Sequence, residues 1–199
     1  ASAMNGFDKG IESLYAANAT PVTDAAAVRG LSLLWDALPT LSDERESWAS
    51  SDILEGIVLV QYGISQPSGT TLSLIHAFGH GLTAHSDVQQ GAAHAMVAPA
   101  ALDYLFAHAD GRRDLLARAF DLDTDEHSHD ELAAAIVEEV TAVRDALELP
   151  SQLRDVDDLQ REDLHAVAET TMDDSLMGNC PPDLDPTVDE LRGVLESAW

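Results

Sequence analysis

The sequence is nearly devoid of lysine and has a single cysteine. Lys9 is the only lysine among 10 basic residues, which stand against 36 acidic residues and leave a formal net charge of −26. A surface with this excess of carboxylates repels nucleic acids and anionic membranes, so we expect neither as a partner. Cys180 has no second cysteine with which to form an intrachain disulfide, which fits a reducing cytoplasm.

Several other features are missing. The sequence has no run of about 18 or more apolar residues that would cross a membrane, and no basic segment followed by an apolar one that would mark a signal peptide. No window alternates apolar and polar residues over β-branched positions, so no strand is predicted. A glycine-rich phosphate loop after a strand is also absent, so we expect no nucleotide-binding half within these 199 residues.

The scarcity of lysine beside so many carboxylates favours a protein adapted to a very salty cytoplasm. Self-repulsion at a net charge of −26 destabilises a compact chain in dilute buffer. At about 1 M salt the screening length falls to roughly 3 Å, and most of that repulsion disappears. An acidic protein of ordinary habitat is the alternative interpretation.

Hydrophobic residues make up 45% of the sequence and recur at helical spacing almost throughout. The pattern predicts one all-α domain over residues 1–199, with about eight or nine helices. They are expected at 1–17, 21–39, 42–64, just before a polar turn at 84–90, and at 91–108, 112–120, 131–147, 159–176 and from 185 onward. Thr20 with Pro21 is predicted to start the second helix and Asp185 with Pro186 the last, since each pair combines a capping side chain with a first-turn proline. Pro99 is expected to bend the helix that contains it.

Four of the eight histidines lie in the stretch 70–99. His76 and His80 are four residues apart within an apolar run, so helical periodicity places both imidazoles on one face. Such a pair is a common way to present two nitrogens to one metal ion or one substrate. Taken singly, each histidine is better explained as a hydrogen-bonded structural residue than as a ligand, and His94 as a helix-packing contact or a minor site residue.

Several sequence blocks occur in the order found in a known family. They are AMNGFDKGIESLY, ANATPVTDAAAVRGLSLLWDALP, ASSDILEGIVL, IHAFGHGL, QGAAHAMVAPAALDY and NCPPDLDPTVDELRGVL. Together they resemble the C-terminal helical domain of the iron-containing alcohol dehydrogenase family, and Asn5 indicates its maleylacetate reductase branch. The resemblance implies the substrate-side half of a homo-oligomeric, NAD(P)-dependent oxidoreductase that acts on an alcohol, aldehyde or keto acid. The family's N-terminal dinucleotide-binding domain, which binds most of the NAD or NADP, would then lie outside residues 1–199 or on a partner chain.

The metal-dependent members of this family bind iron or zinc through four residues. The matching positions here hold Asn5, Lys9, His76 and Gln90, so His76 is the only ligand retained. Amides are weak ligands for a divalent ion and an ammonium group repels it, so a degenerate site without metal is expected. His80 matches a histidine near the nicotinamide and the substrate. The resemblance therefore places His80, Lys9 and His76 in the site, where we predict them as catalytic residues, with Asn5 and Gln90 binding the substrate.

The role of Lys9 has two interpretations. Its ammonium group can replace the missing cation by polarising a carbonyl or binding a substrate carboxylate. Alternatively, it forms a structural ion pair with Glu12 or Asp8.

The function of the chain also has alternatives. The loss of three family ligands is compatible with a non-catalytic helical module retained for oligomerisation or small-ligand binding. A third interpretation is a metal site rebuilt from His76, His80 and His85.

Overall fold

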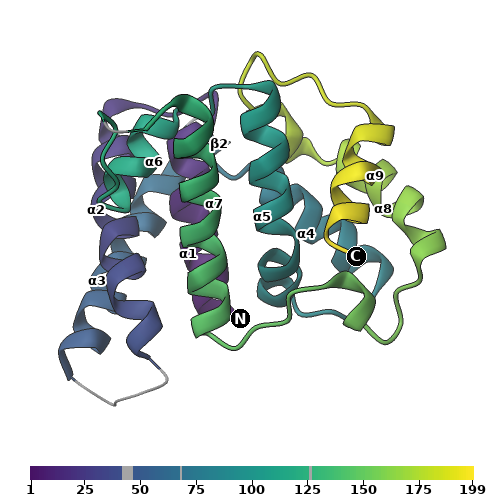
Figure 1. Ribbon diagram of the computed structural model, residues 1–199, viewed down its shortest axis with the longest axis horizontal. Helices are drawn as coiled ribbons and strands as arrows, with labels where there is room; N and C mark the ends of the chain where they lie inside the picture. Colours follow the sequence, from purple (N-terminus) through teal and green to yellow (C-terminus); the bar gives the residue numbers. More distant parts are fainter. Residues whose placement is uncertain (42–46, 68, 126) are drawn as a thin grey trace.

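The computed structural model describes the whole chain except residues 42–46, 68 and 126 (Figure 1). Its helices are α1 (Ser2–Tyr15), α2 (Pro21–Ala37), α3 (Ser47–Ile64), α4 (Leu74–His85), α5 (Gln90–His108), α6 (Arg113–Ala119), α7 (His129–Ala146), α8 (Leu164–Met172) and α9 (Val188–Ser197). Short 3-10 turns lie at Leu38–Thr40, Leu153–Asp155, Arg161–Asp163 and Ser175–Asn179. The predicted all-α fold class is confirmed.

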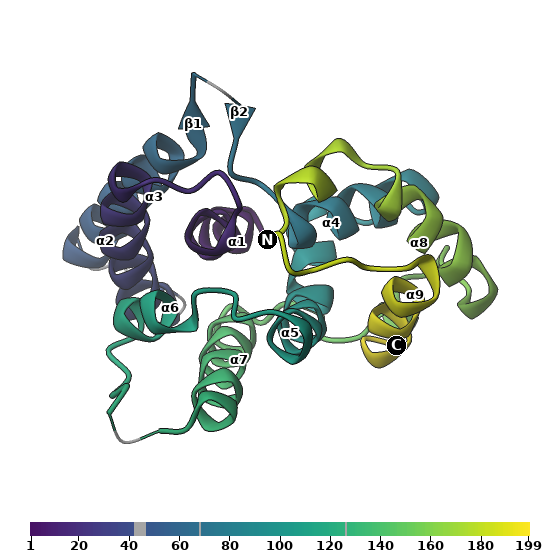
Figure 2. The same cartoon turned by 90° about the horizontal axis from the view of Figure 1, so that it is seen from above.

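Helix α1 lies in the middle of the molecule. Figure 2 shows α2 and α3 on one side of it and α4 on the other, with α8 and α9 beyond α4. Helix α1 contacts α2, α3, α4, α5 and α6. Side chains of the first helix therefore reach most of the interior.

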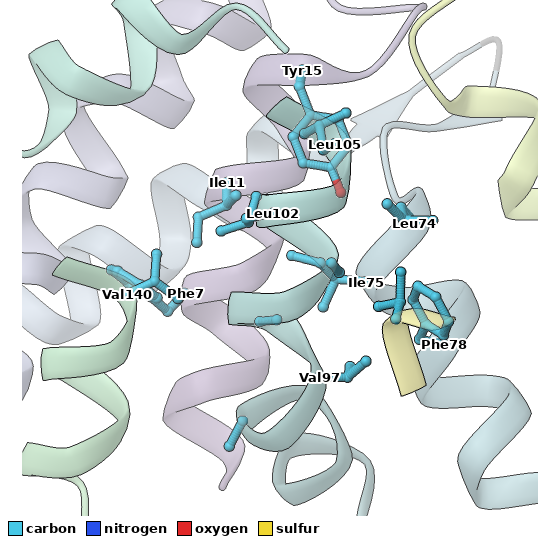
Figure 3. Packing of buried hydrophobic residues seen from close by; sticks show 14 of the residues in the cluster. Phe7, Ile11, Tyr15, Leu74, Ile75, Phe78, Val97, Leu102, Leu105 and Val140 are labelled. Carbon is cyan, nitrogen blue, oxygen red and sulfur yellow. The ribbon is translucent and has the colours of Figure 1, made fainter. Parts of the chain in front are cut away.

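Apolar side chains at helical spacing hold α1 in this position. Phe7 and Ile11 are fully buried, and burying a side chain of this size stabilises the fold by about 1.5–3 kcal/mol. Figure 3 shows them in the same interior as Ile75 of α4 and Leu102 and Leu105 of α5. The core thus joins the three helices that carry the predicted site residues.

Glycines allow two close helix contacts. A Cβ at Gly30 of α2 would lie 2.9 Å from the carbonyl oxygen of Gly56 of α3, and a Cβ at Gly56 would lie 2.9 Å from that of Gly30. At the start of α5, a Cβ on Gly91 would collide with the carbonyl of Ala1. This second contact brings the N-terminal ends of α1 and α5 together, next to Gln90.

One of the two predicted helix starts is confirmed and the other is wrong. Thr20 caps α2 through its side chain, as predicted. The last helix does not begin at Asp185–Pro186, because Thr187 and Glu190 form a capping box two residues later. In that box each side chain accepts a hydrogen bond from the backbone N–H of the other residue, which satisfies two donors at once.

Two other boundaries differ from the prediction. The helix expected at 159–176 is α8 flanked by two 3-10 turns, and α4 extends to His85, beyond the expected start of the polar turn. Helix α5 ends at His108 as predicted, with Pro99 inside it. The expected helix start at residue 42 lies outside the described residues.

A small strand pair forms where no strand was predicted. β1 (Ser65–Gln66) and β2 (Gly69–Thr70) pair antiparallel after α3. Two residues per strand are too few for a period-two pattern to appear in the sequence. No helix in the described part of the chain is long and apolar enough to cross a membrane.

Candidate functional site

The predicted site residues come from three helices that contact one another. Helix α1 carries Asn5 and Lys9, α4 carries His76 and His80, and Gln90 is the first residue of α5. Contacts join α1 with both α4 and α5, and α4 with α5. The structure therefore gathers these residues on adjoining helices, although they lie at different depths.

His76 is buried and held by a carboxylate from α1. Its side chain is 2% exposed, its Nδ1 hydrogen-bonds to Oε2 of Glu12, and its backbone N–H donates to Oε1 of Glu12 at 3.0 Å. Burial raises the pKa of Glu12, but the charge of His76 and the hydrogen bonds from it lower the pKa further, so the net shift is downward. Burial lowers the pKa of His76, but the carboxylate of Glu12 raises it, with a net rise. Each of the two groups therefore favours the charged form of the other.

A second acid–histidine pair lies beside the first. Asp8 and His94 are completely buried, with Nδ1 of His94 3.3 Å from Oδ2 of Asp8. The rings of His94 and His76 lie edge to face, with centroids 4.3 Å apart. Burial raises the pKa of Asp8 by more than the nearby His94 lowers it. Nε2 of His94 lies against Gly79 of α4, where a Cβ would collide with it.

Sequence analysis did not identify these two pairs as one buried cluster. Within the described part of the chain, both carboxylate oxygens of Asp8, both ring nitrogens of His94 and Nε2 of His76 have no hydrogen-bond partner. The sequence does contain a signal, because Asp8 and Glu12 lie four residues apart on the apolar side of α1. Acidic side chains are almost never fully buried without a partner, so acids on a buried face predict basic groups opposite them.

Lys9 lies near this cluster and is half-buried. Its ammonium group donates a hydrogen bond to Oε1 of Gln61 on α3 at 3.1 Å, and it forms no salt bridge with a residue that the structure describes. Glu12 and Asp8, its two expected partners, face the histidines instead. Burial lowers the pKa of Lys9, while Glu12 raises it. The charge of Lys9 also lowers the pKa of His76, so the two groups interact electrostatically.

His80 has an exposed ring and a carboxylate partner. Its side chain is 46% exposed, and its Nδ1 lies 2.7 Å from Oδ2 of Asp174, which is 16% exposed. Asp174 follows α8 and lies 94 positions away in the sequence. Sequence analysis missed Asp174, because no local pattern links residues that far apart.

The structure does not bring His85 together with the other histidines of α4. His76, His80 and His85 each hydrogen-bond to a different residue, and the partner of His85 is the hydroxyl of Thr170 on α8, 2.8 Å from Nε2. Among the residues outside the undescribed gaps, no group of three or more His, Cys, Asp or Glu side chains is arranged to hold a metal ion.

The residues that the resemblance places at the family's metal positions offer few of the donors that a divalent ion prefers. His76 is the only one with a donor that such ions prefer, and its Nδ1 is already bonded to Glu12. Asn5 and Gln90, which are partly buried, offer only amide groups. Lys9 adds a positive charge, which repels a cation.

Comparisons with known proteins place the chain in a family. The sequence profile of the Fe-containing alcohol dehydrogenase family, C-terminal, matches residues 1–199. The chain is 27% identical over 201 residues to a lactaldehyde reductase of Escherichia coli strain K12, in an alignment that covers 100% of this chain and 50% of that protein.

Two solved structures show the same fold. An alcohol dehydrogenase from Oenococcus oeni has a TM-score of 0.90 at 20% identity, covering 100% of this chain and 51% of the other. A maleylacetate reductase from Agrobacterium tumefaciens has a TM-score of 0.78 at 22% identity, with the same coverage of 100% and 51%. This chain therefore spans about half the length of the proteins that it resembles.

Proposed function

This chain belongs to the Fe-containing alcohol dehydrogenase family, whose C-terminal domain it matches from end to end, and we propose that it is the substrate-side domain of an NAD(P)-dependent oxidoreductase. A dinucleotide-binding domain, located before residue 1 in the full protein or on a partner chain, would bind the NAD or NADP. The substrate that we propose is a small alcohol, aldehyde or keto acid. Lactaldehyde and maleylacetate are the first compounds to assay, because they are named in the proteins that this chain resembles.

In the reductive direction, the nicotinamide supplies a hydride to the carbonyl carbon. His80 gives a proton to the carbonyl oxygen, and the product is an alcohol. Histidine suits this role because its ordinary pKa lies close to neutral pH. We assign the proton transfer to His80 rather than His76 because the side chain of His80 is 46% exposed and that of His76 only 2%.

We propose that the site works without a metal ion and that the ammonium group of Lys9 takes over its charge. The observation that supports this proposal is the position of Lys9: it lies at a metal position of the family, its side chain is half-buried, and its ammonium group donates to the neutral amide of Gln61 and not to a carboxylate of the described residues. There the ammonium group would polarise the substrate carbonyl or bind a substrate carboxylate. Asn5, one turn earlier on α1, and Gln90 on α5 would bind the same substrate.

The test of Lys9 is a pair of variants in the full protein. Lys9→Met removes the charge and keeps the length of the side chain, and we expect a loss of about 100- to 1000-fold in kcat. Lys9→Arg keeps the charge and should retain more activity. Oxidation of NADH or NADPH with a panel of aldehydes and keto acids gives the rates. If Lys9→Met has the rate of the unmodified protein, Lys9 has no catalytic role.

Metal dependence is tested separately. We expect the protein to keep its full activity after dialysis against a chelator and to contain far less than one equivalent of iron or zinc. Loss of activity that added iron or zinc restores would contradict the metal-free proposal, while the oxidoreductase proposal would stand.

A non-catalytic helical module is the second candidate, and one surface feature favours it. Leu54, Val58 and Tyr62 form an exposed apolar row along α3, with the spacing that places residues on one helix face. Such a row suits contact with a second copy of the chain. The module would show no reductase activity in the full protein, and Val58→Ser together with Tyr62→Ser would convert an oligomer to a monomer in sedimentation.

We also propose that the protein works in a reducing, salt-rich cytoplasm. The net charge of −26 and the single cysteine support this. The melting temperature should rise between about 0.1 M and 1 M potassium chloride as the repulsion is screened. A constant melting temperature over this range would contradict adaptation to salt.

A further inference from the structure

Asp174 holds the exposed imidazole of His80 from one side. Its Oδ2 lies 2.7 Å from Nδ1 of His80, although the two residues are 94 positions apart. The side chain of Asp174 is 16% exposed, whereas that of His80 is 46% exposed. The arrangement is a shielded acid behind an accessible histidine.

Asp174 is itself fixed by the backbone around it. Its Oδ1 accepts a hydrogen bond from the N–H of Leu176 at 2.8 Å, at the start of the 3-10 turn Ser175–Asn179. Its own N–H donates to the carbonyl of Thr171 at 3.2 Å. One carboxylate oxygen of Asp174 therefore caps the turn while the other faces His80. The hydrogen bond to the backbone fixes the orientation of the Asp174 side chain.

A carboxylate at Nδ1 determines where the neutral imidazole carries its proton. Because the carboxylate can only accept, Nδ1 must donate, and Nε2 is then the nitrogen that takes up or releases a proton. Aspartate has this role in Ser-His-Asp triads, where it orients the histidine and supports its positive charge.

We propose that Asp174 is a positioning residue for the reaction: it keeps the proton of neutral His80 on Nδ1 and presents Nε2 to the substrate oxygen. This inference rests on the proposed function, since it requires that His80 transfers a proton. His76 and His85 do not combine a carboxylate at Nδ1 with an exposed ring. The Nε2 atom of His76 is buried with its carboxylate partner, and His85 contacts the neutral hydroxyl of Thr170.

Asp174→Asn separates positioning from capping. The amide oxygen of asparagine can still accept from the N–H of Leu176, so the turn is preserved. The amide NH₂ would then face Nδ1 of His80, and because that group only donates, the ring must move its proton to Nε2. The variant is thus expected to fold normally with His80 in the wrong tautomer.

The first measurement is the tautomer of His80 in the full protein, by nuclear magnetic resonance with ¹⁵N-labelled histidine. A His80→Gln variant assigns the signal. We expect Nδ1 of neutral His80 to be protonated in the unmodified protein and Nε2 to be protonated in Asp174→Asn. Thr170→Val, which removes the partner of His85, should leave His80 unchanged. The same His80 tautomer in Asp174→Asn and in the unmodified protein would overturn the inference.

The second measurement is the rate of carbonyl reduction. We expect kcat of Asp174→Asn to fall by about 100-fold with little change in KM, and Thr170→Val to keep the full rate. If the unmodified enzyme is active and Asp174→Asn has the same kcat, the inference is wrong and the proposed function stands. If the unmodified full protein reduces no carbonyl compound with either nicotinamide, both are overturned.

Discussion

Two histidines one helical turn apart on α4 have opposite surroundings. His76 is 2% exposed and bonded to Glu12 of α1, whereas His80 is 46% exposed and bonded to Asp174 beyond α8. Each has a carboxylate at Nδ1. They differ in the access to Nε2, which in His76 is buried without a partner. The same local pairing therefore joins two helices in the interior at one position and leaves the histidine side chain accessible to solvent at the other.

The energetics of the two pairs should differ as much as their access. Glu12 and His76 have both lost their hydration, so each depends on the other to offset the cost of burial. His80 and Asp174 remain close to water, which screens their attraction. Loss of a partner should therefore affect stability at the first pair and, under our proposal, activity at the second.

The largest expected effect is that of Glu12→Ala. It leaves His76 buried without its carboxylate, and removing one partner of a buried pair costs about 3–5 kcal/mol of unfolding free energy. Asp174→Asn should cost less than about 1 kcal/mol, because its pair is partly exposed and its turn remains capped. Urea unfolding at constant high salt measures both. Equal losses would show that burial does not distinguish the two pairs.

A smaller effect is expected where α4 packs on His94. Gly79→Ala places a Cβ against Nε2 of His94, and overpacking of this kind costs about 1–3 kcal/mol. Gly193 on α9 is the matched control, because a Cβ there meets nothing within 4 Å. Gly193→Ala should stabilise the protein by about 0.5–1 kcal/mol, since alanine favours the helix. If both variants destabilise the protein, the collision with His94 does not explain the effect of Gly79→Ala.

The sequence predicted the helices well and the partners of the histidines poorly. Helical periodicity is a local property, so the spacing of His76 and His80 was sufficient to place both on α4. Their different exposure depends on which helices cover each turn, and that is set by tertiary packing. The pairing of His80 with Asp174 depends on a contact across 94 positions, which periodicity does not encode.

The prediction for the start of α9 failed for a local reason. Asp185 and Pro186 form a plausible start, but Thr187 and Glu190 satisfy each other's backbone donors. The buried acids of α1 were also visible locally. Asp8 and Glu12 lie on its apolar side, and their burial follows from the position of α1 in the centre of the fold.

The buried pair of Glu12 and His76 should make stability depend on pH. The pKa of Glu12 is lowered on folding, so its stabilisation is present above the unfolded pKa and is lost as pH falls through the folded pKa. The pKa of His76 is raised, so its stabilisation is present below the unfolded pKa and is lost as pH rises through the folded pKa. The pair should therefore stabilise most between the ordinary values of 4.5 and 6.5.

Urea unfolding across this range tests that prediction. Glu12→Gln should flatten the profile on both sides, because it removes the group that lowers one pKa and supports the other. A profile that Glu12→Gln does not alter would mean that the buried pair is not charged.

The smallest expected effect on stability is that of Lys9, whose half-buried side chain is neither fully buried like His76 nor at the exposed pair of His80 and Asp174. Lys9→Met removes a half-exposed hydrogen bond to Gln61, at a cost of about 0.5–1 kcal/mol in stability. Because the ammonium group lowers the pKa of His76, this pKa should rise in Lys9→Met and stay unchanged in Lys9→Arg. Gln61→Ala, which removes the hydrogen bond but keeps the charge, should also leave it unchanged, as followed by nuclear magnetic resonance titration. An unchanged pKa of His76 in Lys9→Met would mean that water screens the ammonium group from the buried pair, and a charge screened in this way could not replace a metal ion.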